Sequence, residues 1–265
     1  MKFIRAIVFW FNFVVFTCIL YALLLLVVLF HELFAKDKRS EGAHWVATVW
    51  GRTLMALAPG WKARVHGLEH LPTPRKDPPV VMVANHQSGA DIWALYLTGA
   101  QFRWLSKAEV FKLPLIGSAM RWAGYVPIHR GDRGSHGAAL RASGEWIKRG
   151  ISMVFFPEGT RSEDGNLKEF KPGAFRLAYE HKVAIQPIII RGTRHMMHKK
   201  SLMPMPAQLE VEVLPPVFPG EAESIEDFTQ RIHGLFQERL QEKMQTLEKA
   251  SPDPLQGLTQ NLELN

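Results

Sequence analysis

The stretch of residues 6–30 constrains the fold more than any other feature. It reads AIVFWFNFVVFTCILYALLLLVVLF, with no formally charged side chain and only Asn12 and Thr17 conspicuously polar. About 20 apolar residues suffice for a helix to cross the core of a bilayer. A helix of about 25 residues would be roughly 37 Å long, enough to span with some tilt.

Three other interpretations compete with a spanning helix. A buried helix of a soluble core rarely runs this long without a charge. A signal peptide has an apolar region of about 7–15 residues before small residues, whereas this run ends in His31-Glu32-Leu33-Phe34. A helix in the membrane plane is usually polar on one face, and this one is apolar all round. We therefore predict a hydrophobic anchor over residues 1–35, either transmembrane or membrane-inserted.

Flanking charges and a second helical stretch predict how the anchor joins the rest. Basic residues are more numerous after the apolar run than before it, which favours a cytoplasmic C-terminal side: Lys2 and Arg5 precede it, and Lys36, Lys38, Arg39 and Arg52 follow it. Residues 45–61 have helical periodicity, tryptophans at the ends and a Pro59-Gly60 stop. We predict a membrane-associated linker helix within residues 36–64, with packing on the following domain as the alternative.

Charge and cysteine content limit the function classes. The net charge of +7 suggests an anionic partner: nucleic acid, an anionic membrane face or a phosphorylated substrate. Without a nucleic-acid-binding motif, and with an apolar anchor, we expect no nucleic-acid partner. One cysteine, Cys18, excludes a disulfide framework, and His195 and His198 have no carboxylate nearby in sequence, so we predict no metal site.

Residues 65–250 read as an α/β domain. β-branched runs predict buried strands, and helical patterns lie between them: strands at 80–84, 151–156, 183–190 and 209–214, helices at 91–98, 115–123, 134–149 and 174–181. Alternation of this kind predicts a mixed, mainly parallel sheet flanked by helices. Pro187 predicts an edge, a kink or a bulge in its strand. An amphipathic helix at 224–247 should pack on the domain, and 251–265 should form a flexible tail.

Two polar motifs follow predicted strands, where α/β sheets bind ligands. His86 comes directly after the first strand, and Asp91 could fold back onto its imidazole and leave the other ring nitrogen as a base. A capping aspartate beside a structural histidine is the alternative. The run Phe156-Pro157-Glu158-Gly159-Thr160-Arg161 follows the next strand. Arg161 would suit a phosphate, although a surface pair with Glu158 is equally compatible.

Two weaker signals lie between these motifs. Residues 124–130 read as a short strand that delivers Arg130, with His129 more typical of a structural residue. Lys107 precedes a turn region containing Pro114 and Gly117. Taken singly, Arg130 and Lys107 are each equally typical of an exposed, solvated side chain.

Taken in order, these motifs resemble the glycerolipid acyltransferase family over roughly residues 65–215. The resemblance rests on NHQSxxD and FPEGTR together, and on the block before Arg130, where the family usually has an aspartate and this chain has His129. It implies that His86 is a general base oriented by Asp91. It also implies that Arg130 and Arg161 bind the acceptor phosphate, while Lys107, Glu158, Gly159 and Thr160 line the acceptor pocket.

The implied reaction is acyl transfer from acyl-CoA or acyl-ACP to the sn-2 hydroxyl of 1-acylglycerol-3-phosphate (lysophosphatidic acid), without a cofactor. It needs no covalent intermediate, in keeping with Cys18 lying in the anchor, and Ser88 is a weak candidate nucleophile. A bacterial inner membrane, with the domain on its cytoplasmic side and lipids as partners, is the implied setting. Another lysophospholipid or a lyso-aminolipid is the alternative acceptor.

Overall fold

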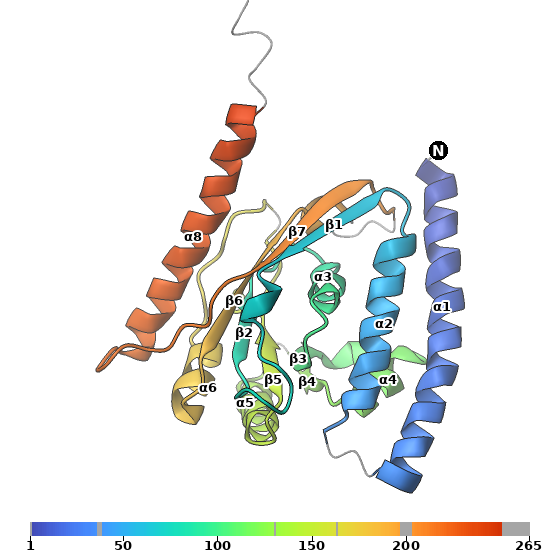
Figure 1. Ribbon diagram of the computed structural model, residues 1–265, viewed down its shortest axis with the longest axis horizontal. Helices are drawn as coiled ribbons and strands as arrows, with labels where there is room; N and C mark the ends of the chain where they lie inside the picture. The colour runs from blue at the N-terminus through green and yellow to red at the C-terminus, as the bar shows by residue number, and fades with distance from the viewer. Residues whose placement is uncertain (1, 36–38, 130, 163, 197–202, 251–265) are drawn as a thin grey trace, which may run out of the picture.

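A computed structural model describes residues 2–35, 39–129, 131–162, 164–196 and 203–250. The predicted tail at 251–265 lies outside the described residues. The architecture is a seven-stranded sheet with helices on both faces (Figure 1). The fold class predicted from the sequence, a mixed and mainly parallel sheet with an N-terminal apolar helix, is therefore confirmed.

The sheet has the strand order β1-β7-β6-β2-β5-β3-β4. The strands are β1 (Trp61–His66), β2 (Val81–Ala84), β3 (Phe102–Lys107), β4 (Val126–Ile128), β5 (Ser152–Phe155), β6 (Ile185–Arg191) and β7 (Ala207–Val213). All neighbours are parallel except β6 and β7, which are antiparallel. All four residues of β2 are buried, as expected for a central parallel strand covered on both faces.

Helices form a layer on each face of the sheet. One layer contains α1 (Lys2–Phe30), α2 (Glu41–Leu57), α3 (Asp91–Leu97) and α4 (Ile116–Trp122). The other contains α5 (Arg133–Lys148), α6 (Gly173–His181) and α8 (Ile225–Ala250). Shorter helical turns complete the chain: π-helical residues His31–Ala35, 3-10 turns Leu68–His70 and Ala108–Lys112, and α7 (Thr193–Met196).

The N-terminal helix α1 lies along the domain, beside α2 (Figure 1). It is long and apolar enough to cross a membrane, and most of its surface is exposed. One stripe is nevertheless packed: Phe9 is buried with its ring 5.1 Å from that of Trp61, and Leu24 is buried further along. Because these positions lie about four helical turns apart, about half of the length of the helix rests on protein along one side.

The second helix, α2, is the amphipathic helix of the linker prediction. Its buried side chains include Val46, Leu54 and Met55, while Trp45 is half exposed. It packs against both α1 and α3, so the alternative of packing on the domain describes it. The sheet itself begins at Trp61, inside the stretch 36–64 for which the sequence predicts only a linker.

Pro187 corrects one prediction. Its strand β6 lies between β7 and β2, so the edge position suggested by the proline is wrong. The Pro187 carbonyl accepts a hydrogen bond from Leu214 N (3.0 Å), just past the end of β7. The nitrogen and the carbonyl of one strand residue face the same side. The nitrogen of Pro187, which has no hydrogen to donate, therefore faces β7 one residue before the paired stretch of β6 begins. No hydrogen bond within the β6–β7 pairing is lost.

Candidate active site

His86 is held at the carboxyl end of β2 by the residue before it. The Asn85 amide donates to Ile190 O (2.8 Å), and Ile190 N donates to Asn85 Oδ1 (2.7 Å). These two hydrogen bonds join Asn85, the residue just after β2, to β6 beyond the last paired residues of the two strands. The chain therefore leaves the sheet with His86 in a fixed position at the edge.

Asp91 turns back from the start of α3 onto His86. Its Oδ2 accepts hydrogen bonds from His86 Nδ1 (2.7 Å), Gln87 N (2.8 Å) and Ser88 N (2.9 Å). The carboxylate is fully buried, whereas 13% of the His86 side chain is exposed. Because a carboxylate accepts, Nδ1 carries the proton and Nε2 keeps its lone pair. Asp91 thus fixes the tautomer of the imidazole and does not cap α3, whose N-cap residue is Ala90.

The FPEGTR segment holds His86 from the other side. The Phe156 ring stacks on the imidazole, with centroids 4.2 Å apart. Glu158 Oε1 accepts from His86 N (2.6 Å), and Ser162 N donates to His86 O (2.8 Å). The backbone of His86 is therefore bonded at both its N–H and its carbonyl to a loop some 70 residues later in the sequence.

Glu158 lies behind the histidine. Its Oε2 accepts from Lys168 N (3.1 Å), so each carboxylate oxygen has a backbone donor. Burial raises the pKa of Glu158 to about 7, outweighing the two backbone hydrogen bonds, which lower it. The side chain is 4% exposed and is not among the residues that line the adjacent cavity. Its contacts indicate a positioning role instead of the substrate contact expected from the sequence.

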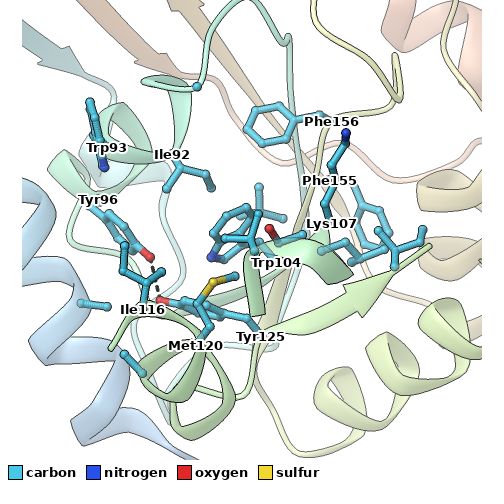
Figure 2. Close-up of a pocket in the computed structure, with 18 of the residues that line it drawn as sticks. Ile92, Trp93, Tyr96, Trp104, Lys107, Ile116, Met120, Tyr125, Phe155 and Phe156 are labelled. Atoms are coloured by element: carbon cyan, nitrogen blue, oxygen red, sulfur yellow. Dashed lines mark hydrogen bonds between the residues drawn. The ribbon is translucent and has the colours of Figure 1, made fainter. Parts of the chain in front are cut away.

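A cavity of about 740 Å³ has His86 in its lining. Figure 2 shows other lining residues, among them Trp104, Lys107 and Phe156. We distinguish two parts by their lining. The apolar end lies between the sheet and α1, α2, α3 and α4, and it is lined by residues such as Leu24, Val46, Tyr96, Trp104, Ala119, Met120 and Tyr125. The polar mouth lies at the carboxyl ends of β2, β5, β3 and β4, and it is lined by His86, Lys107, His136, Thr160, Arg161 and Lys171.

The polar mouth is electropositive. Lys107, Arg161 and Lys171 line it, and no aspartate or glutamate is among the described lining residues of the cavity. Gly159 has a positive φ of 73°, and a Cβ at this position would lie 2.8 Å from Lys171 Nζ. Glycine therefore allows the lysine to lie close over the loop. Cations of this kind favour a phosphate or a carboxylate.

A neutral hydrogen-bonded cluster closes the apolar end. The hydroxyls of Tyr96 and Tyr125 are 2.8 Å apart (Figure 2), and Tyr125 OH is 3.0 Å from His44 Nδ1. Burial lowers the pKa of His44 and raises that of Tyr125 to about 12. His44 Nε2 lies 3.0 Å from the carbonyl of Ala100, so Nε2 donates there and Nδ1 accepts from Tyr125. The cluster is polar but uncharged.

The structure brings most of the predicted site residues together. His86, Lys107, Gly159, Thr160 and Arg161 line the cavity, while Asp91 and Glu158 support His86 from behind. Arg130 lies outside the described residues. Ser88 is buried and outside the cavity lining, and Cys18 is exposed on α1. Among the described parts of the chain, no group of three His, Cys, Asp or Glu side chains is arranged to hold a metal ion.

Several cavity residues escaped the sequence analysis. They are Lys171 and His136 at the polar mouth, and Tyr96, Trp104 and Tyr125 at the apolar end. Lys171 stands ten residues after Arg161 and could have been suspected as a further cation after FPEGTR. The aromatic residues carry no local signal, because an aromatic side chain in a strand or helix usually belongs to the core.

This fold and site define the chain's class. Residues 62–191 match the model of the Acyltransferase family.

Particular relatives narrow the class. The chloroplastic 1-acyl-sn-glycerol-3-phosphate acyltransferase of Arabidopsis thaliana is 42% identical over 159 residues, covering 60% of this chain and 44% of that protein. A 1-acyl-sn-glycerol-3-phosphate acyltransferase of Chlamydomonas reinhardtii is 39% identical over 187 residues, covering 69% of this chain and 55% of that protein. The chain thus spans about half the length of these relatives.

A solved structure is similar over nearly the whole chain. The crystal structure of PlsC, the 1-acyl-sn-glycerophosphate (LPA) acyltransferase of Thermotoga maritima, superposes with a TM-score of 0.75. The two chains are 25% identical, and the match covers 91% of this chain and 96% of PlsC.

Proposed function

We propose that this chain transfers an acyl group from an acyl thioester to the free hydroxyl of 1-acylglycerol-3-phosphate, giving phosphatidic acid. One observation carries the proposal: an imidazole–carboxylate pair stands where an apolar cavity meets a cationic mouth. An acyl chain suits the apolar part, a phosphate suits the cations, and the base lies between them. The names of the relatives point the same way.

The chemistry follows from the tautomer of His86. Nε2 takes the proton of the acceptor hydroxyl as its oxygen attacks the thioester carbonyl carbon. The C–O bond forms, the C–S bond breaks, and the proton passes from Nε2 to the departing thiolate. Asp91 stabilises the imidazolium formed in between, through the 2.7 Å bond to Nδ1. No side chain is acylated, and the chain's own residues need no cofactor for this step.

The polar mouth would recognise the acceptor by its phosphate. Arg161 and Lys107 line the mouth together with Lys171, and guanidinium groups bind phosphate oxygens with two parallel hydrogen bonds. Arg130, outside the described residues, remains a predicted phosphate ligand. A related lysolipid is the alternative acceptor, and the headgroup would then decide which cations contribute.

The packing of α1 favours a helix lying in the membrane surface. A spanning helix needs lipid around it over most of its length, yet α1 carries a protein-packed stripe from Phe9 to Leu24. The remaining faces expose large apolar side chains such as Phe3, Phe11 and Leu26. We propose that α1 inserts these faces into one leaflet, with α2 and the domain beside it. The basic residues after α1 keep the cytoplasmic face of a bacterial inner membrane as the predicted side.

The test is product analysis with purified full-length chain in lipid vesicles. Acyl-CoA and acyl-ACP are each offered with lysophosphatidic acid and with monoacylglycerol, which lacks the phosphate, and products are identified by mass spectrometry. We expect phosphatidic acid from lysophosphatidic acid, and much slower acylation of monoacylglycerol. Equal rates on both acceptors would contradict recognition of the phosphate. If no lysolipid is acylated, the proposed function is wrong.

A further inference from the structure

A second groove lies between α5 and α6, on the far side of the sheet from α1. Its volume is about 650 Å³, within the range of small-ligand sites. Leu140 lines both this groove and the catalytic cavity, so the two are neighbours with this side chain between them. We call it the α5–α6 groove, lined by Gly137, Leu140, Arg141, Ala142, Gly144, Glu145, Lys148, Arg176, Leu177, Glu180 and His181.

Both helices run away from the polar mouth. α5 follows β4, and α6 follows β5 and the FPEGTR loop, so each begins near the carboxyl edge of the sheet. Arg141 is five residues after His136, which lines the mouth, or about 7.5 Å along the helix. Arg176 is three residues after Gly173, which also lines the catalytic cavity, or about 4.5 Å along the helix. Each helix therefore places one arginine just beyond the active site.

These two arginines are available to a ligand. Within the described residues, the guanidinium of neither Arg141 nor Arg176 forms a hydrogen bond or an ion pair, and both residues are exposed. Of the two carboxylates in the groove, Glu145 is bonded to Lys148 (2.9 Å), which lowers the pKa of Glu145. The other, Glu180, is exposed on α6. The pairing of Glu145 leaves two arginines against one carboxylate.

The groove combines an apolar wall with the two exposed arginines. Leu140, Ala142 and Leu177 give it an apolar wall. The two helices approach closely at Gly144, where a Cβ would lie 2.6 Å from His181 Nε2. The position lies beyond the arginines, so the groove narrows away from the mouth.

We propose that the α5–α6 groove binds the nucleotide end of coenzyme A, with Arg141 and Arg176 contacting its phosphates and the apolar wall contacting adenine. The inference rests on the proposed function, because a thioester donor must reach from His86 out of the cavity along some path. The pantetheine arm then crosses the polar mouth, and the acceptor phosphate stays with Lys107 and Arg161. Donor and acceptor phosphates thus have separate sites.

Equilibrium binding of coenzyme A to the full chain, followed by calorimetry, tests this without turnover. Arg141→Ala and Arg176→Ala should each weaken binding about tenfold, the lower range for a charged hydrogen bond at an exposed site. Glu180→Gln should tighten binding several-fold. Lys62→Ala, which removes one exposed positive charge at β1 at the opposite edge of the sheet, should change nothing. Unchanged binding in both arginine variants would overturn the proposal.

Steady-state kinetics with different donors show whether weaker binding in the arginine variants comes from lost contacts to the nucleotide. In the arginine variants the KM for acyl-CoA should rise about tenfold, while the KM for acyl-pantetheine, which has no phosphate, stays at the wild-type value. Equal increases for both donors would indicate a distorted active site and overturn the proposal. A change confined to acyl-ACP would assign the groove to a carrier protein, also against it. A wild-type chain that binds coenzyme A here but acylates no lysolipid would disprove the proposed function alone.

Discussion

The two parts of the catalytic cavity are built on different principles. At the polar mouth, the base is held by directional contacts: His86 is hydrogen-bonded to Asp91, Glu158 and Ser162. At the apolar end, side chains from α1, α2, α3, α4 and β3 contribute surface, with few directional contacts. The mouth therefore depends on atoms in given positions, and the apolar end depends on volume and shape.

This difference predicts how each part responds to substitution. Removing one hydrogen-bonding atom at the mouth leaves a buried partner unsatisfied and moves the reacting groups. Changing one apolar side chain at the other end adds or removes a few methylene groups of space. The mouth should thus control rate, and the apolar end should control which acyl chain is accepted.

The largest effect should come from His86→Ala. Loss of the general base should lower kcat about 10²–10⁴-fold in the acyl-CoA assay, while thermal unfolding shows a folded domain. His136→Ala is the matched control, since His136 lines the same mouth without contacting Asp91. A His136 variant as slow as the His86 variant would show that the mouth tolerates no change at all, and the assigned base would lose its support.

Asp91→Asn should be the next largest. It should lower kcat by roughly 10²-fold because the imidazolium loses its carboxylate partner. The sharper readout is the double variant with His86→Ala, which should be no slower than His86→Ala alone, since Asp91 acts through His86. Additive losses would mean that Asp91 contributes by another route.

The apolar end should respond to Ala119→Leu on α4. The larger side chain fills space for about three carbons, and each buried methylene contributes about 0.8 kcal/mol. With mixed acyl thioesters in competition, the preferred chain should shorten, with several-fold changes in product ratios and little change in total rate. Ala138→Leu, at an exposed position of α5, is the control. An unchanged product distribution would place the acyl chain elsewhere.

The smallest effect should be the pH dependence of stability contributed by Glu158. Its pKa is about 7 in the folded chain against an ordinary 4.5. Because the folded value is the higher one, the contribution is complete below pH 4.5 and is lost as the pH rises through about 7. Glu158→Gln should remove this loss, so the stability gap between variant and wild type should change between pH 5 and 8. Thermal unfolding measures it, with the exposed Glu109→Gln as control; parallel curves would contradict it.

Most residues of the polar mouth could be predicted from the sequence, because they belong to short motifs of neighbouring residues. His86 and Asp91 are five residues apart, and FPEGTR is a contiguous run after a β-branched strand. The strand β3 was not predicted. Its six residues include Arg103, a charged residue that the sequence alone would assign to the surface. In the fold Arg103 is fully buried, donates to Phe102 O and lies 5.1 Å from the Trp146 ring. Only distant residues make that burial possible.

The sequence alone determined the alternation of strands and helices, the long apolar N-terminal segment, and which polar residues follow strand ends, since periodicity and short motifs depend on neighbours in the chain. Tertiary structure decided the interior place of Pro187, the role of Glu158 behind His86 and the lining of the apolar end. These depend on strand order and on contacts across 50 or more residues. Such contacts are set by the packing of layers, which no local pattern specifies.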